Sequence, residues 1–308
     1  SRGSPARLAF TRRAFQMLPD LDSPRILDVG CGQGGPTLEL ARLSGGRVTG
    51  LDIDQTALHE LARRADEEGL SDRVQVVHGS MSDMDFPDES FDVIWAEGSM
   101  HIVGFERALG TWRRFIRPDG FLVVHEMAWL RPEPPSEIAD CPELAYPGIR
   151  TVPEYAELVP DQGYDLVGHF TLPEDFWLLD YFDPMMDRLR GLRKKYADDQ
   201  AAQRTLDREE RAADLYRKYS DWYGSAFFVM QKRAREDYPD ALRGGAEGDG
   251  EDVGTHHLCR GLAWIHRVLG GWLIPKEQDL RGLRRLWYRC LPVIAALRRL
   301  WMVSASRG

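Results

Sequence analysis

Residues 25–54 read RILDVGCGQGGPTLELARLSGGRVTGLDID, and this stretch decides the fold. Residues 26–29 have the apolar character of a short buried strand, the glycine-rich residues 30–35 are typical of a turn, and residues 36–43 predict a helix. A second strand, at 47–53, ends beside an acid. The stretch therefore predicts half of a nucleotide-type α/β site.

The glycines and the acid of this stretch each suit a bound ligand. Gly30, Gly32 and either Gly34 or Gly35 lack Cβ atoms, so the turn can adopt positive φ and a ligand can lie against bare peptide groups at a helix N-terminus. Asp52 stands where a carboxylate can accept both hydroxyls of a ribose. The spacing of these glycines also fits a dinucleotide fingerprint, so the pattern alone leaves an NAD-type oxidoreductase open.

Asp28 favours a different ligand. A carboxylate two residues before Gly30 would repel a pyrophosphate, whereas it suits a ligand that carries a cationic ammonium group. An adenosine with an amino-acid tail is such a ligand.

Further motifs follow in a fixed order along the chain. They are Asp28–Gly34, Leu51–Asp54, Val77–Met81, Phe91–Trp95 and Arg117–Val124. In this order they resemble the class I S-adenosylmethionine-dependent methyltransferases over about residues 1–233. Segments 97–101, 104–107 and 218–224 are similar to a bacterial and archaeal subgroup, of the type 11/25 kind, whose acceptors are mostly unassigned.

The resemblance implies a fold, a reaction and a set of site residues. The fold is a doubly wound, mostly parallel, seven-stranded α/β sheet of Rossmann-like type over residues 1–233. The reaction transfers a methyl group from S-adenosylmethionine to a small-molecule nucleophile at O, N or C, leaving S-adenosylhomocysteine. The implied cofactor-binding residues are Asp28, Gly30, Cys31, Gly32, Gly34, Asp52, Ile53, Ser80, Met81 and Glu97. A catalytically silent protein that binds the adenosyl cofactor or a partner is the alternative, because an intact glycine turn indicates binding and not turnover.

Apolar runs and turn residues place the elements of the domain. Strands are predicted at 25–29, 47–53, 74–79, 91–96, 120–126, 164–172 and 225–233. Helices are predicted at 6–18, 35–44, 55–68, 105–116 and 152–162. The helical insert at 177–223 shows apolar residues at helical spacing and predicts two further helices, which either cover the acceptor pocket as a lid or pack on the sheet or on a second subunit.

Three residues are candidates for catalysis. Glu97 and His101 follow the fourth strand four residues apart, so one turn of helix would place them on the same face, with His101 as general base. His125 ends the fifth strand and is expected to point at the same pocket. The alternative is that Glu97 caps a helix and the histidines pack in the core. The expected walls of the acceptor pocket are Trp95, Met100, Trp129, Tyr146, Trp177 and Tyr181.

Composition agrees with a soluble enzyme. The chain has 308 residues, 43% of them hydrophobic, and its four cysteines are scattered without metal-binding or disulfide spacing, so no metal site is expected. We see no signal peptide and no apolar run of ~18 residues that could cross a membrane. A cytoplasmic location is the expectation.

The C-terminal region departs from the family pattern. Residues 234–254 have the composition of an acidic flexible linker. Residues 255–308 carry ten Lys or Arg against two acids, a net charge of +8, along an amphipathic helical pattern. This tail fits an interfacial helix on anionic lipid, a docking helix for a protein surface, or a poorly ordered extension. Nucleic acid is not the expected partner, because the enzyme domain is acidic and the tail has no recognisable binding motif.

Overall fold

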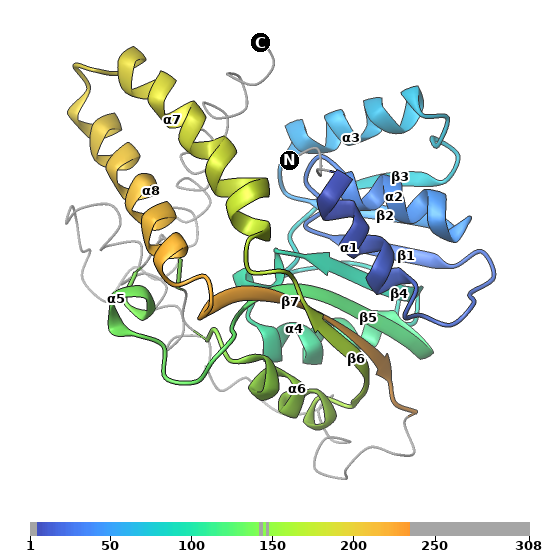
Figure 1. Ribbon diagram of the computed structural model, residues 1–308. Helices are drawn as coiled ribbons and strands as arrows, with labels where there is room; N and C mark the ends of the chain where they lie inside the picture. Colours follow the sequence, from blue (N-terminus) through green and yellow to red (C-terminus); the bar gives the residue numbers. More distant parts are fainter. Residues whose placement is uncertain (1–4, 142–143, 146–147, 235–308) are drawn as a thin grey trace, which may run out of the picture. The chain divides into compact units, whose positions relative to one another are not determined.

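The computed structural model describes residues 5–141, 144–145 and 148–234, and these form an α/β domain around one sheet (Figure 1). Seven strands of this part of the chain lie in the order β3-β2-β1-β4-β5-β7-β6. The first five pair in parallel, and β7 runs antiparallel to both of its neighbours. The strands are β1 (Arg25–Val29), β2 (Arg47–Asp52), β3 (Val74–His78), β4 (Phe91–Glu97), β5 (Ile116–Trp129), β6 (Tyr164–Thr171) and β7 (Tyr223–Lys232). The mostly parallel sheet predicted from the sequence is confirmed.

Helices alternate with the strands as predicted. Those of the main domain are α1 (Pro5–Phe15), α2 (Gly35–Ser44), α3 (Gln55–Glu67), η1 (Met100–Ile102), α4 (Phe105–Trp112), η2 (Arg113–Phe115), α5 (Ser136–Ala139) and α6 (Val152–Asp161). The helix predicted at 105–116 is shorter than expected. It gives way to the turn η2 and then to β5, which starts at Ile116 because that residue pairs with Phe91 of β4.

Two apolar layers cover the two faces of the sheet. On one face, buried residues of α1, α2 and α3 pack against the strands around Trp95 and Phe227. On the other face, α4 and α6 contribute Trp112 and Tyr155 to a second buried cluster. The side chains of Trp95 and Trp112 are 0% and 1% exposed. Helices on both faces leave the carboxyl edge of the parallel strands as the place where polar side chains gather.

The insert between β6 and β7 consists of a short π-helical turn, η3 (Leu178–Phe182), and an antiparallel pair of helices, α7 (Asp183–Lys195) and α8 (Gln200–Lys218). The two predicted helices are therefore confirmed. They pack on each other, on α5 and on the end of β5 (Figure 1), and Arg193 bridges them by ion pairs of 2.6 Å to both Asp207 and Glu210.

The predicted linker beyond residue 234 and the tail at 255–308 lie outside the described residues. Within the described part of the chain, none of the helices combines the length and the apolar character that crossing a membrane requires.

The strand order creates the position for a ligand. β1 and β4 are neighbours, yet the chain proceeds from them toward opposite edges of the sheet. In open α/β sheets, ligands bind outside the carboxyl ends of the strands at this switch point. Asp28, Asp52 and Glu97 all lie at or next to the carboxyl ends of β1, β2 and β4.

Candidate active site

The turn between β1 and α2 requires glycine for reasons of space and of backbone angle. Gly30 and Gly34 have φ of 74° and 77°, which side chains rarely tolerate. A Cβ on Gly30 would lie 2.5 Å from the Cβ of Ser99, and one on Gly34 would lie 2.1 Å from Leu61 Cδ1. The turn is therefore packed closely between the loop after β4 and helix α3.

Asp52 binds the turn directly. Its Oδ2 accepts a hydrogen bond of 2.8 Å from the backbone N–H of Gly32, and its Oδ1 accepts one of 2.8 Å from Asp54. A carboxylate has about four acceptor positions, so two partners leave room for the hydroxyls of a ribose. Ile53, the next residue, is 40% exposed and offers an apolar surface beside the carboxylate. The placement of both residues fits the cofactor-binding roles predicted for them.

Asp28 is a buried carboxyl group at the centre of the site. It is 2% exposed, and its Oδ2 accepts a hydrogen bond of 2.6 Å from the Thr37 hydroxyl of α2. Burial raises the pKa of Asp28 to about 7, and the negative charges of Glu97 and Asp52 also raise it, while the Thr37 hydrogen bond lowers it. A cation bound nearby would stabilise the ionised form.

Glu97 lies on the same side of the sheet and is incompletely paired. Its Oε1 accepts hydrogen bonds of 2.8 Å from Thr11 of α1 and from the indole of Trp95. Its Oε2 is buried and accepts no hydrogen bond from the described residues, and Arg7 Nε is 3.9 Å away. Burial raises the pKa of Glu97, against the lowering effect of Arg7 and the two hydrogen bonds. Such an oxygen marks a place where a donor or a cation is accommodated.

The prediction that Glu97 and His101 share one helical face is wrong. Glu97 is the last residue of β4 and points toward α1, whereas His101 lies beyond a glycine in the short helix η1. Alternation along a strand explains the direction of Glu97, because it repeats the direction of Trp95 two residues earlier.

His101 is instead associated with Glu126 of β5. The His101 backbone N–H donates a 2.9 Å hydrogen bond to Glu126 Oε2, and the imidazole Nδ1 is 3.6 Å from Glu126 Oε1. The Glu126 side chain is 1% exposed and that of His101 is 37% exposed. A partly exposed imidazole backed by a buried carboxylate has the arrangement of a general base held by an orienting group.

His125 occupies a different environment from the one expected. It is 2% exposed and stacks on Phe227, with ring centroids 4.6 Å apart, and on Trp177 at 6.0 Å. Neither ring nitrogen has a hydrogen-bond partner among the described residues. Burial, with a contribution from Arg7, lowers the pKa of His125 to about 3. This buried, stacked position differs from the open one expected at the pocket, and the catalytic role of His125 stays a prediction.

The loop after β3 closes the other side of the glycine turn. The Met81 side chain is 7% exposed and its Cε would lie 3.2 Å from a Cβ on Gly30. The backbone carbonyl of Met81 accepts a 3.1 Å hydrogen bond from Trp112, and Ser80 Oγ accepts one of 3.2 Å from Ser82. Ser80 and Met81 are therefore next to the turn, as their predicted role requires.

Cys31 can contribute to the site only through its backbone. Its thiol is buried against Gly50, where a Cβ would lie 2.9 Å from the sulfur, and burial raises its pKa. The side chain fills space under the turn.

Most of the expected pocket walls belong to the core. Trp95 and Met100 are 0% exposed, and Trp129 packs on Tyr223. Trp177 stacks on His125, Tyr181 is 41% exposed, and Tyr146 lies outside the described residues.

Sequence reasoning missed three residues that complete the site, Arg7, Thr11 and Thr37, and it expected Glu126 at the pocket only together with His125. Arg7 and Thr11 are four residues apart on the first helix, so helical spacing could have placed them on one face. Strand alternation could have separated Glu126 from His125. Within the described ranges, no three His, Cys, Asp or Glu side chains gather where they could hold a metal ion.

These residues fit an adenosyl ligand with an amino-acid tail. At Gly32 the turn is open, since nothing lies within 4 Å of the place of a Cβ, and Asp52 lies beside this peptide with acceptor positions to spare. Asp28 and Glu97, whose Oε2 accepts no hydrogen bond from the described residues, lie in a buried place where their ionised forms would stabilise an ammonium and a sulfonium. A pyrophosphate would meet repulsion from both carboxylates.

Known proteins show the same pattern. Residues 26–120 match the family model described as "Methyltransferase domain". Sterol 24-C-methyltransferase ERG6B of Gibberella zeae is 40% identical over 107 residues, which cover 34% of this chain and 28% of that protein. The 27-O-demethylrifamycin SV methyltransferase of Amycolatopsis mediterranei is 29% identical over 202 residues, covering 62% and 71%. The chain spans less than two thirds of the length of the sterol 24-C-methyltransferases that it matches.

Solved structures agree on the fold. The S-adenosylmethionine-dependent methyltransferase from Geobacter sulfurreducens, crystallised with S-adenosylhomocysteine, superposes with a TM-score of 0.64 at 24% identity, covering 76% of this chain and 93% of that one. Residues 26–120 therefore contain a methyltransferase domain, and the sheet order and the solved structures show that the described chain has the fold of the class I S-adenosylmethionine-dependent methyltransferases.

Proposed function

We propose that this protein transfers the methyl group of S-adenosylmethionine to a nucleophilic atom of a small molecule. The observation that carries the proposal is the pair of buried carboxyl groups, Asp28 and Glu97, beside the glycine turn. One oxygen of Glu97 has no hydrogen-bond partner among the described residues, so this pair has room for a donor or a cation of the ligand. When bound, S-adenosylmethionine supplies a methyl group that is electrophilic because it is attached to a sulfonium.

The chain's own residues orient the two reactants. Asp52 holds the turn through Gly32 and accepts ribose hydroxyls, while Asp28 pairs with the ammonium of the methionine part. Glu97, held by Thr11 and Trp95, stabilises positive charge near the end of β4. Alignment of the nucleophile with the methyl group, with water excluded, accounts for most of the acceleration in this type of reaction.

His101 is the proposed proton acceptor. Its imidazole is partly exposed, and Glu126 holds it from behind through the backbone N–H and Nδ1. The proposed role of this imidazole is to take a proton from a hydroxyl, phenol or amine as the methyl group is transferred. A general base of this kind typically raises the reaction rate by about 10²-fold or more.

The acceptor class is proposed to be an uncharged small molecule with an apolar skeleton. The relatives support this, since their names refer to sterols and to a rifamycin. The charges support it too, because Arg7 and the cationic groups of the cofactor already balance Asp28 and Glu97.

The remaining expectations are part of the same proposal. They are a cytoplasmic location, homodimer formation through the insert, and contact of residues 255–308 with an anionic membrane or a protein. Their support is the basic and apolar composition of the tail and the helical insert.

The experiment is a transfer assay with radiolabelled methyl donor. Purified protein is incubated with S-adenosylmethionine labelled in the methyl group and with a panel of sterols and phenols, and prenyl diphosphates and amines serve as the charged comparison. The proposal predicts that label passes to at least one class of acceptor and that His101→Ala lowers the rate while the affinity for S-adenosylhomocysteine is kept. Retained cofactor binding with no transfer to any acceptor would favour the catalytically silent alternative.

A further inference from the structure

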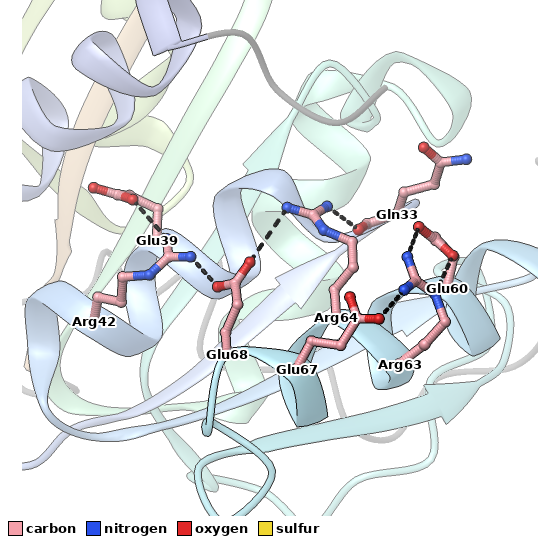
Figure 2. A network of polar contacts seen from close by, with 8 residues as sticks. All are labelled: Gln33, Glu39, Arg42, Glu60, Arg63, Arg64, Glu67 and Glu68. Carbon is pink, nitrogen blue, oxygen red and sulfur yellow. Dashed lines mark hydrogen bonds and ion pairs between the residues drawn. The ribbon is translucent and has the colours of Figure 1, made fainter. Parts of the chain in front are cut away.

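The glycine turn is held from a neighbouring helix by an arginine. Arg64 of α3 donates a 2.8 Å hydrogen bond from Nη1 to the backbone carbonyl of Gln33, which lies between Gly32 and Gly34 (Figure 2). The Arg64 side chain is 16% exposed. One helical turn earlier, Leu61 lies directly under Gly34, so α3 contacts the turn at two points.

The arginine fixes one side of a peptide group whose other side is already bound. The Gly34 N–H donates to the carbonyl of Cys31 at 2.9 Å, while the Gln33 carbonyl of the same peptide points to Arg64. Because a peptide group is planar and trans, two partners on opposite sides set its orientation. Gly34 has a φ of 77°, and glycine has more backbone freedom to lose than other residues, so a tether here orders the turn.

A network of ion pairs orients the arginine in turn. Glu68 Oε1 is 4.0 Å from Arg64 Nη2, and Glu68 also pairs with Arg42 of α2. Arg42 bonds to Glu39 at 2.9 Å, as Figure 2 shows, and Glu39 bonds to Arg12 of α1 at 2.5 Å. The guanidinium is thus connected through side chains to α2, the helix that follows the turn, and through α2 to α1.

We propose that Arg64 is a positioning residue for the adenosyl cofactor. It holds the Gln33–Gly34 peptide so that the turn keeps the form in which Gly32 meets Asp52 and bare peptide groups face the ligand. Arg64 acts through the turn and does not itself touch the ligand. The inference rests on the cofactor site of the proposed function.

The chain offers a matched control in the adjacent residue. Arg63 also forms ion pairs, with Glu60 at 2.7 Å and with Glu67, but both partners belong to α3 itself (Figure 2). Arg63→Met therefore removes an arginine from the same helix without releasing the turn. Arg64→Met removes the hydrogen bond to Gln33 and keeps most of the aliphatic packing.

The test is calorimetric titration of the full chain with S-adenosylhomocysteine, together with amide hydrogen exchange in the ligand-free protein. Arg64→Met should weaken binding about tenfold, which corresponds to about 1.4 kcal/mol, whereas Arg63→Met should change it less than about twofold. Exchange at residues 32–35 should be faster in Arg64→Met alone. Arg64→Lys keeps one donor and should fall between the wild type and the methionine variant, and it replaces that variant if Arg64→Met fails to fold.

The outcomes separate this inference from the proposed function. Equal affinity and equal exchange in the wild type and in the Arg64 variants would overturn the role of Arg64. A lower melting temperature with unchanged affinity would show a purely structural residue and would also overturn it. Failure of the wild type to bind S-adenosylhomocysteine would instead refute the proposed cofactor site.

Discussion

Replacing Asp28 with asparagine should stabilise the ligand-free protein, and the gain should grow with pH. Burial raises the pKa of Asp28 from 3.8 to about 7 in the folded chain. Between these two values the folded protein holds a proton that the unfolded chain has released, so the wild type loses stability as pH rises through this range. Asparagine does not ionise, so the variant does not lose stability in this way.

The magnitude follows from the size of the shift. At ~1.36 kcal/mol per pKa unit, the full cost of ionising Asp28 in the fold is about 4 kcal/mol once the pH exceeds 7. At pH 5 only about 1.5 kcal/mol of this cost is present. The difference in unfolding free energy between the variant and the wild type should therefore grow by about 2–3 kcal/mol between pH 5 and pH 8. The hydrogen bond from Thr37 is kept, because the asparagine oxygen can accept it.

The assay is urea unfolding of both proteins at several values between pH 5 and pH 8. Glu97 and Asp52 are present in both proteins, so the part of their titration that does not depend on the charge of Asp28 cancels in the difference. The same variant should bind S-adenosylhomocysteine more weakly, because the partner of the ammonium is lost. A stability gap that stays constant with pH would refute the view that Asp28 is held in an unfavourable environment for its charge.

Three further changes have defined outcomes. Asp52→Ala should weaken S-adenosylhomocysteine binding at least tenfold by calorimetry, since two charge-assisted hydrogen bonds of ~1.5–3 kcal/mol each are lost; unchanged affinity would exclude a ribose contact. Glu126→Gln should lower turnover about tenfold or more and shift its pH profile with affinity kept, because His101 loses its orienting group; an identical profile would contradict this role. Gly34→Ala should lower the free energy of unfolding, measured in urea, by about 3 kcal/mol. The reasons are the φ of 77° and the 2.1 Å between the added Cβ and Leu61 Cδ1; an unfolding free energy equal to that of the wild type would contradict the packing argument.

The sequence was sufficient for the features that depend on local patterns. Apolar runs bounded by turn residues predict the parallel strands, and the spacing of Gly30, Gly32 and Gly34 after Asp28 predicts the glycine turn between β1 and α2. These predictions succeed because the strand, the turn and the helix form within one continuous segment of 30 residues or fewer.

Features set by contacts distant in sequence could not be predicted in this way. Four residues separate Glu97 from His101, but a strand end and a glycine intervene, so helical spacing does not apply. His101 meets Glu126 only because β4 and β5 are neighbours in the sheet. The environment of His125 depends on Phe227, about a hundred positions later in the chain, and burial in this environment, with a contribution from Arg7, lowers the pKa of His125.

The contact that supports the glycine turn also joins residues distant in sequence, so it could not be predicted from local patterns. The hydrogen bond from Arg64 to the Gln33 carbonyl joins α3 to the loop before α2, and the sequence alone does not show which face of α3 meets that loop. Helical phase separates the two arginines, since Arg64 lies three residues after Leu61 and shares its face toward the turn. Such a residue is found only once the packing of α3 is known.

The central claim is that the acids and the glycine turn bind an adenosyl ligand with an amino-acid tail. The measurement that tests it most directly is calorimetric titration of the wild type, Asp28→Asn and Asp52→Ala with S-adenosylmethionine, S-adenosylhomocysteine and NAD. We predict that the wild type binds both adenosyl ligands and not NAD, and that both variants bind them at least about tenfold more weakly. Binding of NAD alone, or equal binding of the adenosyl ligands by all three proteins, would contradict the account.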